Sequence, residues 1–142
     1  MPLLSVWAVR LAIGYLTVGA VLGTLLLAAR AAVLPTVFFR QLAAHIDVML
    51  VGWLVQLAVG VGYWILPRVE GKRPRAALAV TAVALLNIGV PLAAAGGTAG
   101  IGAMVLAGRM AELAGALTFG AHAWTRVRYG GLVGRVQIAP DP

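Results

Sequence analysis

Long apolar blocks occupy most of the chain, and short breaks with proline, glycine or charged residues separate them. Four blocks reach the roughly 20 residues that a helix needs to cross a bilayer, and they cover residues 5–29, 43–66, 76–95 and 100–123. The breaks are a segment around Pro35, the charged run PRVEGKRPR at 67–75 and the tripeptide GGT at 96–98. The pattern predicts an all-α fold, an integral membrane four-helix bundle. It forms one domain over residues 1–125, followed by a short tail at 126–142.

Composition supports this prediction. Of the 142 residues, 62% are hydrophobic and 11% are charged, whereas an average soluble domain has roughly 25% charged residues. A soluble fold of this length could not bury so much apolar surface, so we expect the lipid bilayer to surround the bundle. The first apolar block is too long for the core of a signal peptide, and no basic segment precedes it. We therefore expect it to be retained as the first span.

The basic residues predict the orientation, because cytoplasmic loops of membrane proteins are enriched in Lys and Arg. The second break and the tail lie on one side of the predicted membrane, and the first and third breaks lie on the other. The side with the second break and the tail has seven basic residues, namely Arg68, Lys72, Arg73, Arg75, Arg126, Arg128 and Arg135. The other side has two, Arg30 and Arg40, so the side with the second break and the tail is predicted to be cytoplasmic. We expect both termini in the cytoplasm, N-in and C-in, in a multi-pass protein of the cytoplasmic membrane. Because the basic residues are spread along the chain, no nucleic-acid partner is expected.

The block at 43–66 carries polar and small residues on one face. Positions three, four or seven apart share a helix face, and this stripe contains His45, Met49, Gly52, Gln56, Gly60 and Tyr63. The other faces are aliphatic, with Val48, Leu50, Val51, Leu54, Leu57 and Val61. We expect the stripe to face protein and the aliphatic side to face lipid. His45 then either binds a ligand or hydrogen-bonds a neighbouring helix. Asp47 lies off the stripe, where it is either solvated or beside a basic partner.

Other polar residues lie within the predicted spans. Arg109 and Glu112 are three apart, so their side chains can meet, and we expect an ion pair inside the bundle rather than a proton relay. Asn87 is expected to hydrogen-bond across helices, and Gly19 and Gly23 to allow close helix contact. His122 is predicted near the opposite membrane face from His45. The two histidines therefore cannot share one metal within a monomer.

The sequence has no cysteine, which excludes disulfides, thiolate metal sites and covalent c-type haem attachment. It also has no phosphate-binding loop, no HExxH and no CxxC motif.

One segment has a family resemblance. HIDVMLVGWLVQLAVGVGYWILPR at 45–68 resembles the second helix of subunit I of the haem-copper oxidases, closest to the cbb3-type and nitric oxide reductase-like branch. The shared pattern is a His near the outer face, a Gly-Trp pair, a glycine-rich stretch, an aromatic and a final Pro-Arg. The first predicted span is similar to the family's first helix, and Asn87-Ile88-Gly89 matches the third loosely. The fourth span matches poorly.

The resemblance implies that His45 ligates the iron of a b-type haem. Gly52 would leave space for a porphyrin edge, and Arg30, Arg40 or Arg109 would meet the propionates. The family has about a dozen helices, and the copper-site histidines lie on helices that have no counterpart here. This chain by itself is therefore not a complete terminal oxidase. The second axial position would be filled by a homodimer partner, by another respiratory membrane subunit or by nothing, and the role would be electron transfer or support of a respiratory complex.

Two alternatives stay open at this stage. One is a haem-free structural or assembly subunit of a respiratory complex. The other is a small proton-coupled multidrug-type transporter, in which Glu112 would carry the proton.

Overall fold

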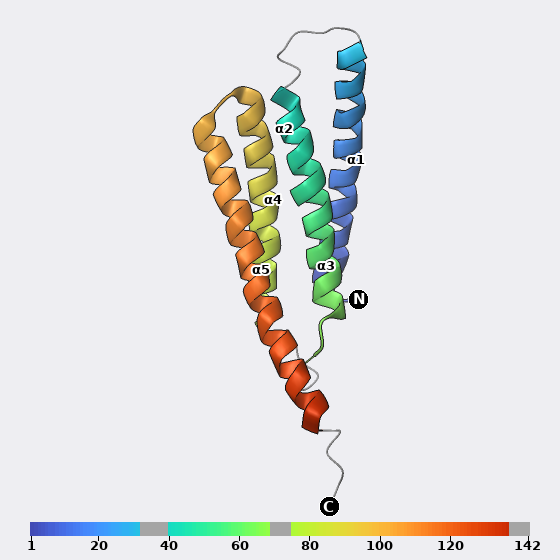
Figure 1. Ribbon diagram of the computed structural model, residues 1–142, viewed down its shortest axis with the longest axis vertical. Coiled ribbons are helices and arrows are strands. Elements are labelled where there is room, and N and C mark those ends of the chain that lie inside the picture. The colour runs from blue at the N-terminus through green and yellow to red at the C-terminus, as the bar shows by residue number, and fades with distance from the viewer. Residues whose placement is uncertain (32–39, 69–74, 137–142) are drawn as a thin grey trace, which may run out of the picture.

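The computed structural model describes residues 1–31, 40–68 and 75–136, with side chains up to residue 128 except that of Arg40. Figure 1 shows a bundle of long helical rods. The first rod is α1 (Leu3–Ala31). The second rod consists of α2 (Arg40–Asp47), the π-helix η2 (Val48–Val55) and α3 (Gln56–Ile65) in direct succession. The third and fourth rods are α4 (Ala76–Ala99) and α5 (Gly102–Val136). The described part of the chain is therefore all-helical, with the predicted number of rods.

Three rods are long and apolar enough to cross a membrane, namely Leu3–Ala31, Gln41–Ile65 and Ala76–Ala99. The fourth, α5, has Arg109 and Glu112 in its interior and is less apolar. Its 35 residues extend over about 52 Å at 1.5 Å per residue. This length exceeds the roughly 30 Å hydrocarbon core of a bilayer, and the C-terminal part of α5 reaches beyond the lower ends of the other helices (Figure 1).

The ends of the rods differ from the predicted breaks in two places. The tripeptide Gly96–Thr98 was expected to be the hinge, but it lies inside α4. The turn is at Gly100, whose φ of 74° is left-handed, and the Ile101 N–H donates to the Gly96 carbonyl at 2.8 Å. This is the usual glycine-terminated helix end. At the other end of α5, the helix continues into the predicted tail as far as Val136. Most of the first and second breaks, at residues 32–39 and 69–74 with Pro35, Lys72 and Arg73, lies outside the described residues.

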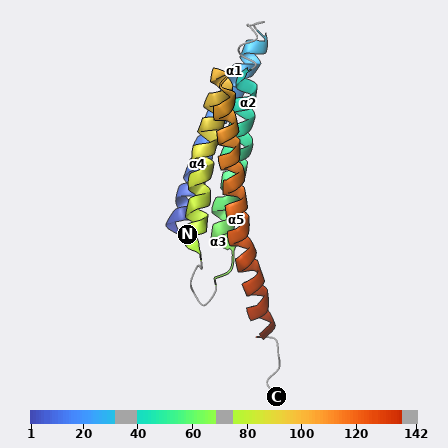
Figure 2. The same cartoon turned by 90° about the vertical axis from the view of Figure 1, so that its left-hand side faces the viewer.

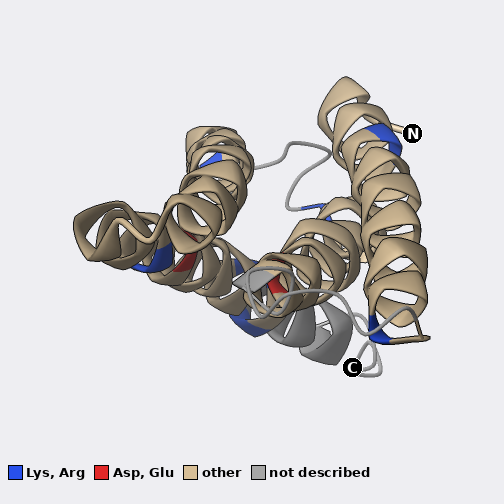
Figure 3. Cartoon of the chain, turned by 90° about the horizontal axis from the view of Figure 1, so that it is seen from above, with Lys and Arg blue, Asp and Glu red and all other residues tan. Residues whose placement is uncertain are grey.

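The rods form two antiparallel hairpins. One consists of α1 and the second rod, and the other of α4 and α5. The second rod and α4 join the hairpins, and Figure 2 shows α4 and α5 running side by side. From above, in Figure 3, the rods stand in an open arrangement, with α1 at one side and the α4–α5 hairpin at the other.

Glycines allow close backbone contact within the second hairpin. Gly89 and Gly96 on α4 face α5, and Gly108 and Gly115 on α5 face α4, each pair seven residues apart. A Cβ atom on Gly108 would lie 2.5 Å from the Ala93 backbone nitrogen. Small residues at such positions let helices pack tightly in membrane proteins. This seven-residue spacing was not identified from the sequence.

Glycines also bring α1 against the second rod, as predicted. A Cβ on Gly23 would lie 2.8 Å from His45 Cε1, and one on Gly60 would lie 2.9 Å from Ala8 Cβ. Nearby, Ala8, Val59, Val83 and Leu86 form the buried apolar core.

The predicted faces of the second rod are largely confirmed. Gly52, Gln56, Gly60 and Tyr63 of the polar stripe are buried, and Leu50 and Leu54 are about half exposed at 54% and 50%. The assignment of Val48 to the lipid face is wrong, because it is buried and packs where α1 has Gly19. Val48 begins the π-helix, whose wider i→i+5 turn departs from the α-helical face pattern.

Candidate functional site

The imidazole of His45 is held by the backbone of α1. Its Nδ1 atom lies 2.9 Å from the carbonyl oxygen of Gly19. A carbonyl can only accept a hydrogen bond, so Nδ1 carries the hydrogen, and Nε2 is the nitrogen left to bind a ligand. Histidines that ligate metals in proteins are commonly held this way, with the second ring nitrogen donating to a carbonyl or carboxylate.

Two apolar grooves meet at His45. The first has a volume of about 320 Å³ and is lined by Gly23, Leu26, Leu27, Arg30, Leu42 and His45. The second, also of about 320 Å³, is lined by His45, Ile46, Met49, Leu50, Trp53 and Leu54. Apolar walls with one free imidazole nitrogen and one guanidinium suit a flat apolar ligand that has acidic groups at its edge.

The structure brings His45 to these grooves but places Gly52 and Arg109 elsewhere. The face of Gly52 is covered by the ring of Tyr15, since a Cβ there would lie 2.7 Å from Tyr15 Cγ. Arg109 is on α5 and pairs with carboxylates. Of the three arginines expected near the propionates, Arg30 lines the first groove, and the side chain of Arg40 is outside the described residues.

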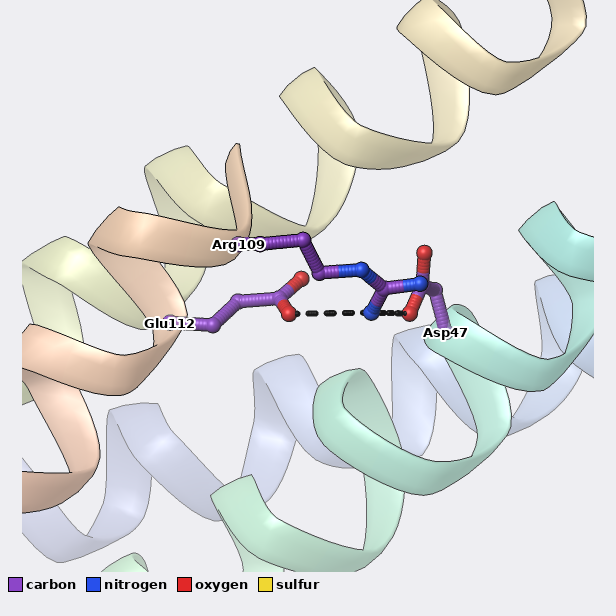
Figure 4. Close-up of polar contacts among 3 residues, drawn as sticks. All are labelled: Asp47, Arg109 and Glu112. Atoms are coloured by element: carbon purple, nitrogen blue, oxygen red, sulfur yellow. Dashed lines mark hydrogen bonds and ion pairs between the residues drawn. The ribbon is translucent and has the colours of Figure 1, made fainter. Parts of the chain in front are cut away.

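Arg109 holds two carboxylates from different rods (Figure 4). Its Nη1 atom is paired with Asp47 Oδ1 on the second rod and lies 3.1 Å from Glu112 Oε2 on α5. The predicted Arg109–Glu112 pair is confirmed. For Asp47, the second of the two expectations holds, because its side chain is buried and has a basic partner. This ionic cluster links the two hairpins.

A second polar network links three rods. The Tyr15 hydroxyl on α1 donates to Asn87 Oδ1 on α4 at 3.2 Å, and Asn87 Nδ2 donates to Gln56 Oε1 on the second rod at 3.1 Å. The prediction that Asn87 hydrogen-bonds across helices is confirmed. Because polar side chains in an apolar surrounding need partners, this network fixes the rods against one another.

The lower part of α5 holds the ends of two other rods. Arg126 is fully buried. Its guanidinium donates to the carbonyls of Pro67, Leu66 and Tyr63. The last carbonyls of a helix have no partner within it, so Arg126 supplies donors where the second rod ends. His122, one turn before, has Nδ1 at 3.1 Å from the Arg75 carbonyl, next to the start of α4. Its Nε2 faces Arg126 Nη1 at 3.4 Å.

The two histidines therefore lie at opposite ends of the bundle, as expected, and they differ in availability. Both ring nitrogens of His122 have protein partners, whereas among the described residues only Nδ1 of His45 has a hydrogen-bond partner. Within the described residues, no three His, Asp, Glu or Cys side chains are grouped as a metal site would require. The roles of Arg126 and His122 in the bundle were not identified from sequence.

Comparison of the chain with protein-family models, with curated proteins and with solved structures finds no match. The resemblance to the haem-copper oxidases therefore stays a prediction that rests on the residues of the second rod.

Proposed function

We propose that this chain is a multi-pass protein of the cytoplasmic membrane with both termini in the cytoplasm. The apolar rods support insertion, and the distribution of seven basic residues against two supports the orientation. In Figure 1 the N-terminus, the end of the second rod and the lower part of α5 lie toward the same end of the bundle. That end carries the exposed side chains of Arg68, Arg75 and Arg128.

We further propose that the protein binds a b-type haem through Nε2 of His45. The hydrogen bond from Nδ1 to the Gly19 carbonyl carries this proposal, because it orients the ring and leaves Nε2 as the metal-binding atom. The residues around it fit a haem, since the groove walls are apolar and Arg30 can pair with a propionate. Bound haem would supply a one-electron redox centre.

Only one free imidazole nitrogen is presented by the described residues at this site, so the second axial ligand would come from outside the chain. A two-fold homodimer would supply a second His45 at the same depth in the membrane, and another respiratory membrane subunit would serve equally. Either arrangement suits electron transfer to or within a respiratory complex, as the haem-copper oxidase resemblance implies. If haem does not bind, the same chain would act as an accessory or assembly subunit.

A proton-coupled transporter is the second candidate function. The observation that favours it is Glu112, a buried carboxylate within a rod that contains the Arg109 cluster. Ionisable residues within membrane spans commonly lie on ion or proton pathways.

An absorption spectrum distinguishes the haem protein from the transporter. The protein would be purified from haem-replete cells, and its absorption spectrum would be recorded after oxidation and after reduction. We expect a Soret band and a redox-dependent b-type spectrum. A colourless preparation that also fails to take up added haemin would reject the haem proposal. Proton-coupled efflux of cationic dyes by vesicles would then support the transporter.

A further inference from the structure

The charges of the ionic cluster do not balance. Within the described residues, one guanidinium, that of Arg109, serves two carboxylates, those of Asp47 and Glu112. Both acids are buried, at 3% and 7% exposure. If both were ionised, the cluster would carry one surplus negative charge, and uncompensated charge is costly away from water.

Among the side chains that the structure describes, the surrounding rods place no second cation at the cluster. On α4, which packs along α5, the whole span Ala76–Ala99 has no ionisable side chain. On the second rod, the charged residue that contacts Arg109 is Asp47, which already belongs to the cluster. His45 on the same rod is hydrogen-bonded to Gly19 of α1. On α5 the other ionisable side chains that the structure describes lie toward the far end of the rod, where His122 and Arg126 bond to carbonyls and Arg128 is exposed. On α1, Arg10 lies over the Trp7 ring, and Arg30 lines the groove at His45.

One atom of the cluster has no partner. Glu112 Oε2 accepts from Arg109, but Glu112 Oε1 is buried and has no hydrogen-bond partner among the described residues. Figure 4 shows this second oxygen beside the Arg109 side chain, away from the dashed contacts. Asp47, in contrast, makes the closest contact with the guanidinium. An unpartnered carboxylate oxygen in a buried site with surplus negative charge is the natural position for a proton.

We propose that the Asp47–Arg109–Glu112 cluster is a proton-binding site, in which Glu112 carries one exchangeable proton and Asp47 and Arg109 form the ion pair. The proposal concerns the resting charge of the cluster and does not depend on whether the chain binds haem. The proton also governs the contact between the hairpins. With Glu112 neutral, Arg109 is paired across the hairpins with Asp47. When Glu112 loses the proton, it competes from the same helix for the same Nη1 atom.

Infrared spectroscopy of the purified full chain tests this proposal, because a protonated carboxyl has a carbonyl stretch that a carboxylate lacks. The sequence has only four Asp and Glu residues, which makes the assignment simple. We expect a deuterium-sensitive carboxyl band at neutral pH that disappears completely in Glu112→Gln. It should also disappear in Asp47→Asn, because Arg109 and Glu112 then balance one to one and Glu112 ionises. The control Glu70→Gln, at a position outside the described residues, should keep the band.

Thermal unfolding in detergent gives a second readout. The wild type should lose stability as the pH rises and the folded protein loses its proton, whereas Glu112→Gln, which mimics the protonated form, should not. Absence of the band in the wild type, or its persistence in Glu112→Gln or in Asp47→Asn, would overturn the proposal. Stabilisation of the wild type by Na⁺ with no carboxyl band would overturn it too, because the site would then bind a metal cation.

Discussion

His45 on the second rod and Gly19 on α1 are joined by a hydrogen bond of 2.9 Å from the imidazole Nδ1 to the carbonyl oxygen. The bond crosses the first hairpin and passes beside Gly23, whose missing side chain leaves room for the ring. The position of the free Nε2 atom therefore depends on glycine at two places of α1. A larger residue at either place would move the second rod or the ring.

Gly23→Ala should reduce haem binding. The new Cβ would lie 2.8 Å from His45 Cε1, so the ring must shift, and overpacking of this kind costs about 1–3 kcal/mol. The ratio of haem to protein and the thermal unfolding midpoint would be measured for the purified variant. Gly14→Ala is the matched control, because it lies on the same helix with no atom within 4 Å of the added carbon. An equal loss of haem binding in Gly23→Ala and Gly14→Ala would show that the effect is not local to His45.

Arg109→Ala should destabilise the bundle by about 3 kcal/mol. This is the lower end of the cost of breaking a buried pair, chosen because the Arg109 side chain is 45% exposed. The triple change Asp47→Asn, Arg109→Ala, Glu112→Gln removes every charge of the cluster and should be less destabilising than Arg109→Ala alone. Chemical unfolding in detergent would rank the two proteins. A triple variant that is the less stable would contradict the role of charge imbalance.

Arg126→Ala should loosen the end of the second rod. The change leaves the carbonyls of Leu66 and Pro67 without their guanidinium donor, and hydrogen bonds to charged groups contribute about 1.5–3 kcal/mol each. Arg128→Ala removes an exposed arginine two residues away and serves as the control. Limited proteolysis between residues 67 and 75 should become faster in Arg126→Ala only. An unchanged rate would mean that the guanidinium does not hold the end of the second rod at Leu66 and Pro67.

Cysteine labelling tests the proposed orientation, since the chain has no cysteine of its own. A membrane-impermeant maleimide added to intact cells should modify a cysteine placed at Thr98, which is exposed near the α4–α5 turn. It should not modify a cysteine placed at Arg73 until the membrane is opened. The reverse pattern would place both termini outside.

The helical rods and much of the polar pairing could be predicted from the sequence, because both follow from spacing along one helix. The Arg109–Glu112 contact and the buried face of Gln56 and Gly60 are of this kind. Contacts between helices were harder to predict. The Asp47–Arg109 pair and the hold of Arg126 on the second rod depend on how the rods are rotated and aligned. The π-helix alters that rotation after Asp47, and the spacing of apolar residues does not signal it.

The predicted haem site was also only partly correct, because it too depends on contacts between helices. His45 was placed by its helical stripe, and the structure adds the carbonyl that orients it. Gly52 was expected to leave room for a ligand, but Tyr15 from α1 fills that room. Arg109 was expected to meet the propionates, yet it pairs with Asp47 and Glu112.

The haem proposal requires that His45 bind the iron. Reduced-minus-oxidised spectra of the wild type, His45→Ala and His122→Ala, purified in parallel from haem-replete cells, test this requirement. We expect a b-type difference spectrum in the wild type and in His122→Ala, and its complete loss in His45→Ala with the helical circular dichroism unchanged. A b-type spectrum that persists in His45→Ala, or a wild type without any Soret band, would contradict the claim.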